Sequence, residues 1–188
     1  MNPIYSLPEL LIIGGSSRNT GKTSLAVRLI EKYAKEHSIT GLKVTSIRRG
    51  EEEYHGRHED VINEAKFTIY EETNFQGDKD TCRMLAAGAK RVFYIQTTEQ
   101  YLDEAFKNFL SLKSDHSPII CESRSLRAVV KPGLLVLLKH YNPAFIKPGF
   151  SQLEALADLT ITMHQEKENT AQETEAIIWN GQTWKLKT

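Results

Sequence analysis

The stretch LIIGGSSRNTGKTS, residues 11–24, decides how the rest of the chain is interpreted. A short apolar run leads into a glycine-containing loop that ends in Gly21, Lys22 and Thr23. This order is typical of a phosphate-binding loop, in which backbone N–H groups surround a phosphate, the lysine contacts the β- and γ-phosphates and the threonine hydroxyl binds Mg²⁺. A helix that begins after the loop adds partial positive charge at the same place. The stretch therefore predicts a site for a nucleoside triphosphate.

The glycine spacing departs from the strict pattern G-x-x-x-x-G-K-[ST], because Ser16 stands where the first glycine is expected. Either the loop is one residue longer and starts at Gly15, or it keeps the usual length and Ser16 takes the first turn. An ordinary glycine turn between a strand and a helix is the simpler alternative, but it explains neither Lys22 nor Thr23. We expect the following residues to hold the nucleotide: Gly15, Ser16, Asn19, Thr20, Gly21, Lys22, Thr23 and Ser24.

The composition limits the class of protein. A chain of 188 residues that is 40% hydrophobic and 26% charged predicts one globular α/β domain over residues 1–188. Because the net charge is zero, we expect binding to neither nucleic acid nor membrane. The apolar runs are too short to cross a bilayer, and the start of the chain lacks the pattern of a signal peptide. The two cysteines, far apart in sequence, predict no disulfide and a cytoplasmic location.

Strand-like and helix-like segments alternate along the chain. We expect strands at residues 10–13, 39–47, 66–71, 90–97, 118–123, 133–140 and 158–163, and helices after the glycine loop and at residues 78–89, 98–112 and 150–157. Gly41 marks a weak point or a bulge in the second strand. Residues 165–175 read as a polar connector. The alternation predicts a three-layer P-loop NTPase fold with a mostly parallel central sheet.

The end of the chain has the pattern of a β-hairpin. Residues 175–187 alternate on both sides of Asn180 and Gly181, a pair that favours a two-residue type I′ turn. We expect this hairpin to be an appendage of the nucleotide-binding domain.

Two acidic residues are candidates for a metal site next to the loop. Glu122 ends an apolar strand, so we expect it to hold Mg²⁺ or its water and, together with Lys22, to act in catalysis; a turn cap at Ser123 is the alternative. Asp80 begins a predicted helix, where it either contacts the metal or only caps the helix. With Thr23, these two carboxylates form the expected Mg²⁺ site.

Two basic residues are candidates for contact with a substrate. Lys43 lies inside the second strand, where a charge is unfavourable unless it is paired or directed at a ligand, although a lysine on an edge strand also prevents aggregation. Arg48 starts a highly charged stretch, residues 48–60, that we interpret as a solvated loop near the ligand. His55 and His58 in that stretch have the spacing of two zinc ligands, but a solvated loop is the favoured interpretation.

The loop GGSSRNTGKT, residues 14–23, resembles that of dethiobiotin synthetase and cobyrinic acid diamide synthase relatives, which also have five residues between the glycine and Gly-Lys-Thr. The continuation to about residue 123 resembles the MobB family of molybdopterin-guanine dinucleotide biosynthesis, with a strand lysine in GLKVTSI, a charged loop, a Lys-Asp-Thr run at residues 79–81 and an acid-ended strand. The likeness implies that Lys22 and Thr23 serve phosphate and Mg²⁺, that Asp80 and Glu122 surround the metal, and that Lys43 faces the substrate.

The resulting functional hypothesis is Mg²⁺-dependent binding and hydrolysis of ATP or GTP, with the resemblance implying a MobB-like adapter in molybdenum cofactor biosynthesis. One alternative is an ATP-dependent ligase or kinase of the dethiobiotin synthetase type. Another is a non-catalytic module that binds nucleotide and docks onto a partner enzyme. The expected partners are a small-molecule or pterin substrate and either a second copy of the chain or a partner enzyme.

Overall fold

The structure is a computed structural model that describes residues 5–47, 66–164 and 171–187. Its main sheet consists of β1 (Tyr5–Gly15), β2 (Thr40–Ile47), β3 (Phe67–Glu71), β4 (Arg91–Thr98), β5 (Ile119–Glu122), β6 (Val130–His140) and β7 (Leu159–Met163). The spatial order is β3-β4-β2-β5-β1-β6-β7, and only the β3–β4 pairing is antiparallel. The predicted α/β class with a mostly parallel central sheet is therefore confirmed.

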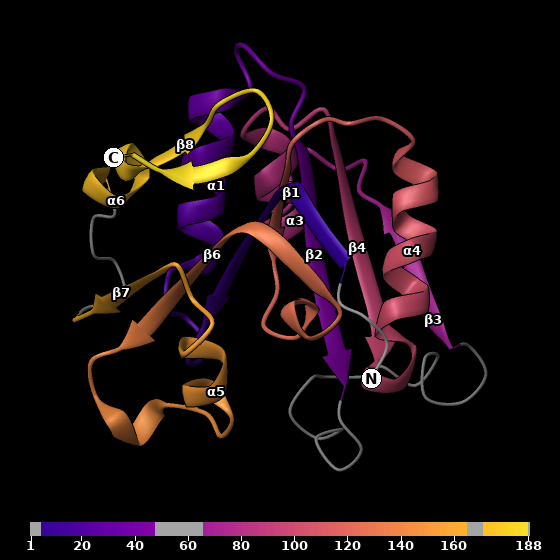
Figure 1. Ribbon diagram of the computed structural model, residues 1–188. Helices are drawn as coiled ribbons and strands as arrows, with labels where there is room; N and C mark the ends of the chain where they lie inside the picture. The colour runs from indigo at the N-terminus through magenta and orange to yellow at the C-terminus, as the bar shows by residue number, and fades with distance from the viewer. Residues whose placement is uncertain (1–4, 48–65, 165–170, 188) are drawn as a thin grey trace.

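Helices cover both faces of this sheet (Figure 1). The α-helices are α1 (Lys22–Tyr33), α3 (Asp80–Ala86), α4 (Leu102–Lys113), α5 (Phe150–Glu154) and α6 (Ala171–Ala176), and the short 3₁₀ helices are η2 (Glu99–Tyr101), η3 (Leu126–Ala128) and η4 (Pro143–Phe145). Apolar residues of α1 and α3 form one core with one face of the sheet, whereas those of α4 and α5 form a second core with the other face.

The central strand β1 shows why the sequence folds in this way. Residues 10–13 of β1 are buried on both faces, as expected for an inner strand of a parallel sheet. Leu11 and Ile13 pack in the core that contains α1, and Leu10 and Ile12 pack in the core that contains α4. The strand extends beyond the predicted run because Tyr5, Ser6 and Leu7 also pair with β6.

The strand order brings the expected site residues to one edge of the sheet. β5 lies between β1 and β2, so Glu122 at its end is opposite Ile13 on one side and Lys43 on the other. From β1 the chain moves first toward β2 and β4 and later crosses to β6 and β7 on the opposite side. In open α/β sheets, ligands bind at the carboxyl ends of the strands where the connections diverge in this manner.

Three local predictions were wrong. Gly41 is not in a bulge, because β2 pairs without interruption with β4; a side chain there would crowd Val92, whose nearest atom is 3.1 Å from the Cβ position. The connector predicted at 165–175 is helical in α6 from Ala171 onward, and residues 165–170 lie outside the described part.

The third error concerns the C-terminal hairpin, which is present but has a different turn from the predicted one. β8 (Ile177–Trp179) pairs antiparallel with β9 (Trp184–Leu186), and Trp179 is opposite Trp184, so four residues rather than two form the turn. The Asn180 carboxamide oxygen accepts hydrogen bonds from the N–H groups of Gln182 and Thr183, and it organises this longer turn. Trp184 is fully buried in the core with α1, so the hairpin is packed into the fold and is not an appendage.

Two further observations concern the chain as a whole. Among the described residues, none of the helices has the length and apolar character needed to cross a membrane. Cys82 and Cys121 are both buried and free, in agreement with the expectation of no disulfide.

Candidate functional site

The loop between β1 and α1 starts from a residue that is fixed to β6. The Ser16 N–H donates to the Leu138 carbonyl oxygen at 2.9 Å, and the Ser16 hydroxyl accepts a hydrogen bond from the His140 N–H at 2.8 Å. The Ser16 carbonyl oxygen in turn accepts from the Lys147 N–H at 2.9 Å. Ser16 is fully buried. Its side chain therefore anchors the loop and does not form its first turn.

Gly15 is the position at which the loop needs a glycine. A Cβ atom on Gly15 would lie 2.5 Å from the Thr20 hydroxyl oxygen and 2.9 Å from Cδ of Lys22. The loop thus folds back over Gly15, with Asn19 (φ 58°) and Gly21 (φ 83°) in the left-handed region. This geometry favours the longer of the two predicted loops, which starts at Gly15.

The backbone N–H groups of this loop are open to a ligand. Within the described part of the chain, no N–H group of residues 17–24 donates a hydrogen bond, and the first to do so is that of Leu25, to the Gly21 carbonyl oxygen at 3.0 Å. No side chain caps the start of α1. Free N–H groups at the start of a helix of 12 residues attract anions, both as donors and through the helix dipole.

Lys22 lies across the same loop. Its ammonium group donates to the Ser17 carbonyl oxygen at 2.8 Å and to the Thr20 hydroxyl oxygen at 3.2 Å. Burial lowers the pKa of Lys22, and the negative charge of Glu122 offsets this only in part. The ammonium group is bound only to neutral oxygens of its own loop, so an anion entering the loop offers it a stronger partner.

Thr23 connects the loop to the two predicted acidic residues. Its hydroxyl oxygen is 2.7 Å from Oε2 of Glu122 and 3.0 Å from Oδ1 of Asp80. Asp80 is the first residue of α3, and its carboxylate binds Thr23 and Lys43 instead of capping that helix, for which no side-chain cap is present. Helix capping as the sole role of Asp80 is therefore wrong.

Lys43 forms an ion pair with Asp80, and its ammonium nitrogen is 4.0 Å from Oε1 of Glu122. Burial alone would lower the pKa of Lys43, but Glu122 and Asp80 outweigh that effect and raise it. Burial alone would likewise raise the pKa of Asp80, but its contacts with Lys43 and Thr23 lower it. Both groups are therefore held in their charged forms. Since Lys43 is paired inside the sheet, it does not serve as a guard on an edge strand.

The donors of this cluster suit a hard cation. Two carboxylates and a hydroxyl provide only oxygen ligands, the kind that Mg²⁺ prefers. No group of three or more His, Cys, Asp or Glu side chains with metal-binding geometry occurs in the described ranges. Mg²⁺ commonly keeps several waters and uses one or two carboxylates plus substrate phosphates, so the residues present fit a nucleotide-bound Mg²⁺.

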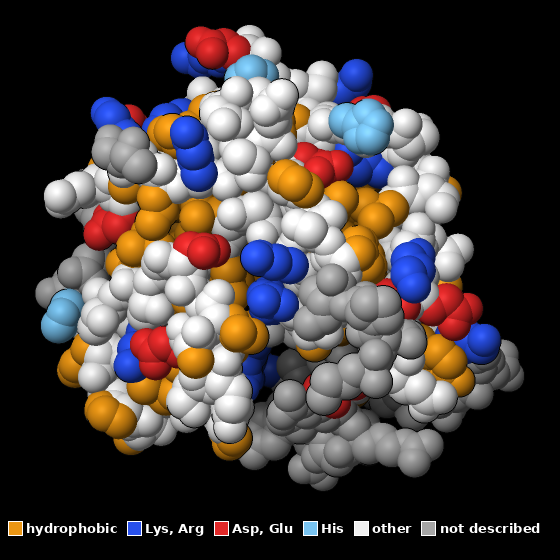
Figure 2. Space-filling view, viewed as in Figure 1, with side chains coloured by type: hydrophobic (Ala, Val, Ile, Leu, Met, Phe, Trp, Pro, Cys, Tyr) orange, Lys and Arg blue, Asp and Glu red, His pale blue; other side chains and the backbone are white. Residues whose placement is uncertain are grey.

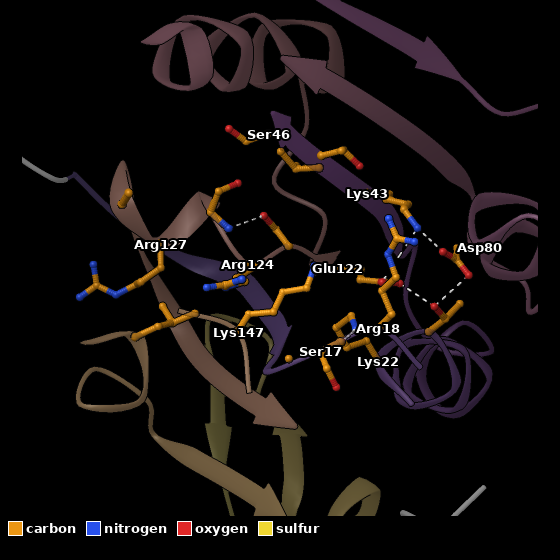
Figure 3. A pocket seen from close by; sticks show the side chains of 18 of the residues that line it. Ser17, Arg18, Lys22, Lys43, Ser46, Asp80, Glu122, Arg124, Arg127 and Lys147 are labelled. Carbon is orange, nitrogen blue, oxygen red and sulfur yellow. Dashed lines mark hydrogen bonds and ion pairs between the residues drawn. The ribbon is translucent and has the colours of Figure 1, made fainter. Parts of the chain in front are cut away.

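A cavity of about 1060 Å³ opens onto the loop and the acidic residues. Its described lining includes seven basic residues, namely Arg18, Lys22, Lys43, Arg83, Arg124, Arg127 and Lys147. The acidic residues of the lining are three, Asp80, Glu99 and Glu122, which leaves a formal charge of +4 in a chain of zero net charge. Figure 2 shows Lys and Arg side chains beside and inside a hollow, and Figure 3 shows those of the cavity from close by. The positive formal charge of the lining therefore favours an anionic ligand over a cationic one.

The structure thus brings together the predicted loop residues with Lys43, Asp80 and Glu122. Arg48, predicted to contact substrate, lies outside the described residues, as do His55 and His58. Sequence reasoning missed Arg124 and Arg127, which also line the cavity. Their only sequence signal is the run ESRSLR, which begins with Glu122 at the end of β5.

Comparisons of this chain with models of protein families, with curated proteins and with solved structures found no match.

Proposed function

We propose that this chain is a P-loop NTPase of three-layer α/β fold that binds the Mg²⁺ complex of ATP or GTP and hydrolyses or transfers the terminal phosphoryl group. The observation that carries the proposal is the row of unpaired N–H groups over residues 17–24, beside the ammonium group of Lys22. Such an arrangement stabilises a polyphosphate through many short contacts to fixed donors. The formal charge of the cavity supports the same ligand.

Each residue of the cluster has a chemical role in this proposal. Lys22 leaves the Ser17 carbonyl and places its charge on the β- and γ-phosphates, where negative charge develops during transfer. The Thr23 hydroxyl, which contacts both carboxylates, would be a ligand of Mg²⁺. Glu122, almost fully buried at 7% exposure, orients the attacking water or acceptor. Mg²⁺, when bound, neutralises charge on the phosphates.

Lys43 and Asp80 adjust the charge of the metal site. Since the Lys43 ammonium group pairs with Asp80, it neutralises a carboxylate in the absence of metal. If Mg²⁺ were held beside Asp80 and Glu122, it would neutralise these carboxylates, and the Lys43 ammonium group would become available to a phosphate of the nucleotide. This exchange keeps the site close to neutral in both states.

The resemblance of residues 10–123 to the MobB family supports a role as adapter in molybdenum cofactor maturation in the cytoplasm. The alternative of a small-molecule kinase or ligase is favoured by one observation, the extension of the cavity from the loop to Arg127.

The test is calorimetric titration of the wild-type chain and a Lys22→Ala variant with Mg–ATP and Mg–GTP. We expect saturable binding of at least one nucleotide to the wild type and affinity at least about tenfold weaker in Lys22→Ala. Lys90→Ala, at an exposed position, removes the same charge and is expected to bind like the wild type. Equal affinity in the Lys22 variant and the wild type would refute the proposed site.

A further inference from the structure

The cavity continues beyond the phosphate loop into a second region, which we call the distal lobe. It is lined by Arg124, Arg127, Val129, Leu153 and Leu156. In Figure 3, Arg124 and Arg127 lie at one end of the cavity, Lys43 and Asp80 lie at the other, and Glu122 lies between them. A volume of about 1060 Å³ slightly exceeds the usual range for a single small-molecule site, roughly 300–1,000 Å³. The distal lobe is thus continuous with the loop and separate from the Thr23 cluster.

Arg127 is the residue of this lobe that indicates most directly what kind of ligand would bind. It lies in η3, is half-buried, and has no carboxylate partner among the residues that the structure describes. A guanidinium group withdrawn partly from water is costly without a partner, and its planar fork matches the two oxygens of a carboxylate or phosphate. Arg127 therefore presents an unused receptor for an oxyanion.

Arg124 is held in place beside it. Its guanidinium group donates to the Pro148 carbonyl oxygen, at the turn before α5. This bond ties the segment after β5 to the segment before α5, so the two walls of the distal lobe are joined.

Apolar side chains line the same lobe. Val129 and Leu153 are partly buried against the core that contains α4, and Leu156 is 51% exposed. Apolar side chains in contact with water contribute no favourable free energy of burial. The carbon skeleton of a ligand would remove them from water and so stabilise the complex. The combination of a guanidinium group and apolar walls selects a ligand that is anionic at one end and apolar elsewhere.

We propose that the distal lobe binds a small organic oxyanion, with its carboxylate or phosphate on Arg127 and its apolar part on Leu153 and Leu156. Binding of this oxyanion does not depend on the proposed function. Its role as a substrate beside the nucleotide does rest on the proposed function. The ligand and the nucleotide then occupy opposite ends of one cavity, with Glu122 between them.

The test is an NMR titration with hexanoate, hexyl phosphate and, as the neutral analogue, hexanol. The wild type is titrated with a saturating, non-hydrolysable Mg–ATP analogue, and Lys22→Ala is titrated without nucleotide. We expect saturable binding of at least one anion in both samples, and much weaker binding of hexanol. The tighter of the two anions identifies the group that Arg127 prefers.

Variants locate the site. Arg127→Gln is expected to weaken anion binding by about tenfold or more, and Arg127→Lys by less. Lys131→Gln removes the same charge at an exposed position at the start of β6 that does not belong to the described cavity lining, and should bind like the wild type. Leu156→Glu introduces a negative charge at an exposed position of the lobe and should also weaken anion binding. It replaces Arg127→Gln as the test variant if Arg127→Gln fails to fold.

Several outcomes would overturn this inference. These are the absence of saturable anion binding, equal binding of hexanol, or equal loss in Lys131→Gln and Arg127→Gln. Displacement of the anion by nucleotide, or its loss in Lys22→Ala, would mean that the anion occupies the phosphate loop, and would also overturn it. Failure of nucleotide binding alone would refute the proposed function while leaving the distal lobe supported by the Lys22→Ala titration.

Discussion

The Thr23 hydroxyl oxygen lies 2.7 Å from Oε2 of Glu122, although 99 residues separate the two in the chain. Thr23 belongs to the first turn of α1, and Glu122 ends β5. The parallel pairing of β1 and β5 sets this contact, because it aligns Ile13 with Glu122 directly before the loop begins. The proposed metal-facing residue and the residue proposed to orient the nucleophile are therefore adjacent.

Substitution of Glu122 separates catalysis from binding. Glu122→Gln keeps the shape of the side chain and a hydrogen-bond acceptor for Thr23, but it removes the charge that orients a nucleophile. We expect the rate of phosphate release at saturating Mg–nucleotide to fall by about 10²–10⁴-fold. The dissociation constant measured by calorimetry should change by less than about tenfold.

Glu31→Gln, at an exposed position on α1, is the control for this measurement and should retain the wild-type rate. A Glu122→Gln protein that releases phosphate at the wild-type rate would remove Glu122 from the proposed mechanism.

The close approach at Gly15 gives a second prediction. In Gly15→Ala the new methyl group would meet Thr20 and Lys22, so the loop must open and Lys22 must move. We expect a loss of about 1–3 kcal/mol in the free energy of unfolding, the usual cost of overpacking, and nucleotide affinity lower by at least about tenfold. Chemical denaturation and calorimetry measure the two effects.

Ser17→Ala is the matched control in the same loop. The Ser17 hydroxyl has no hydrogen-bond partner within the described ranges, and Lys22 binds the carbonyl oxygen of this residue, which alanine retains. Its stability and affinity should stay within about 0.5 kcal/mol of the wild type. Equal behaviour of Gly15→Ala and Ser17→Ala would show that the loop tolerates a side chain at Gly15.

Local patterns in the sequence predicted most of the elements. The apolar run at residues 10–13, the four-residue spacing after the loop and the apolar strand that ends at Glu122 are all signals within a few neighbouring residues. The type of turn at Asn180 was wrong because the side-chain hydrogen bonds to Gln182 and Thr183 decide it, and a dipeptide preference does not contain them.

The order of the strands and the distal basic residues could not be predicted in this way. The insertion of β5 between β1 and β2 depends on non-local pairing, and it brings Glu122 beside Lys43 and Thr23. Arg127 has no local pattern that distinguishes it from any exposed arginine. Its environment arises only when the segment after β5 and the segment around α5 line one cavity.

The ion pair between Lys43 and Asp80 gives a prediction about pH. The pKa of the Asp80 carboxyl is below its usual 3.8, so its charge stabilises the folded state fully above that value and less as the pH falls through the lowered pKa. The pKa of Lys43 is above 10.5, so its contribution is complete below 10.5 and is lost as the pH rises through the raised pKa.

We therefore expect Asp80→Asn to destabilise the protein by about 1–2 kcal/mol across the neutral range, between the values for exposed and buried pairs. The difference from the wild type should shrink in acid and at high pH, as measured by urea denaturation at a series of pH values. Asp103→Asn breaks the Lys107 pair on the exposed side of α4 and should cost no more than about 0.5 kcal/mol. If the difference in the free energy of unfolding between Asp80→Asn and the wild type did not change with pH, the pKa shifts of Asp80 and Lys43 would not contribute to stability in this way.

The C-terminal hairpin provides the last prediction, through Trp184. This side chain is fully buried, its indole N–H donates to the Glu9 carbonyl oxygen at 2.9 Å, and its ring meets that of Tyr33 edge-on at 5.2 Å. Trp184→Ala removes this packing and should lower the free energy of unfolding by about 3–5 kcal/mol. Trp184→Phe keeps a ring but leaves the Glu9 carbonyl without its donor, so it should cost about 1–3 kcal/mol. A loss below about 1 kcal/mol in Trp184→Ala, measured by urea denaturation, would mean that the packing of Trp184 contributes little to stability.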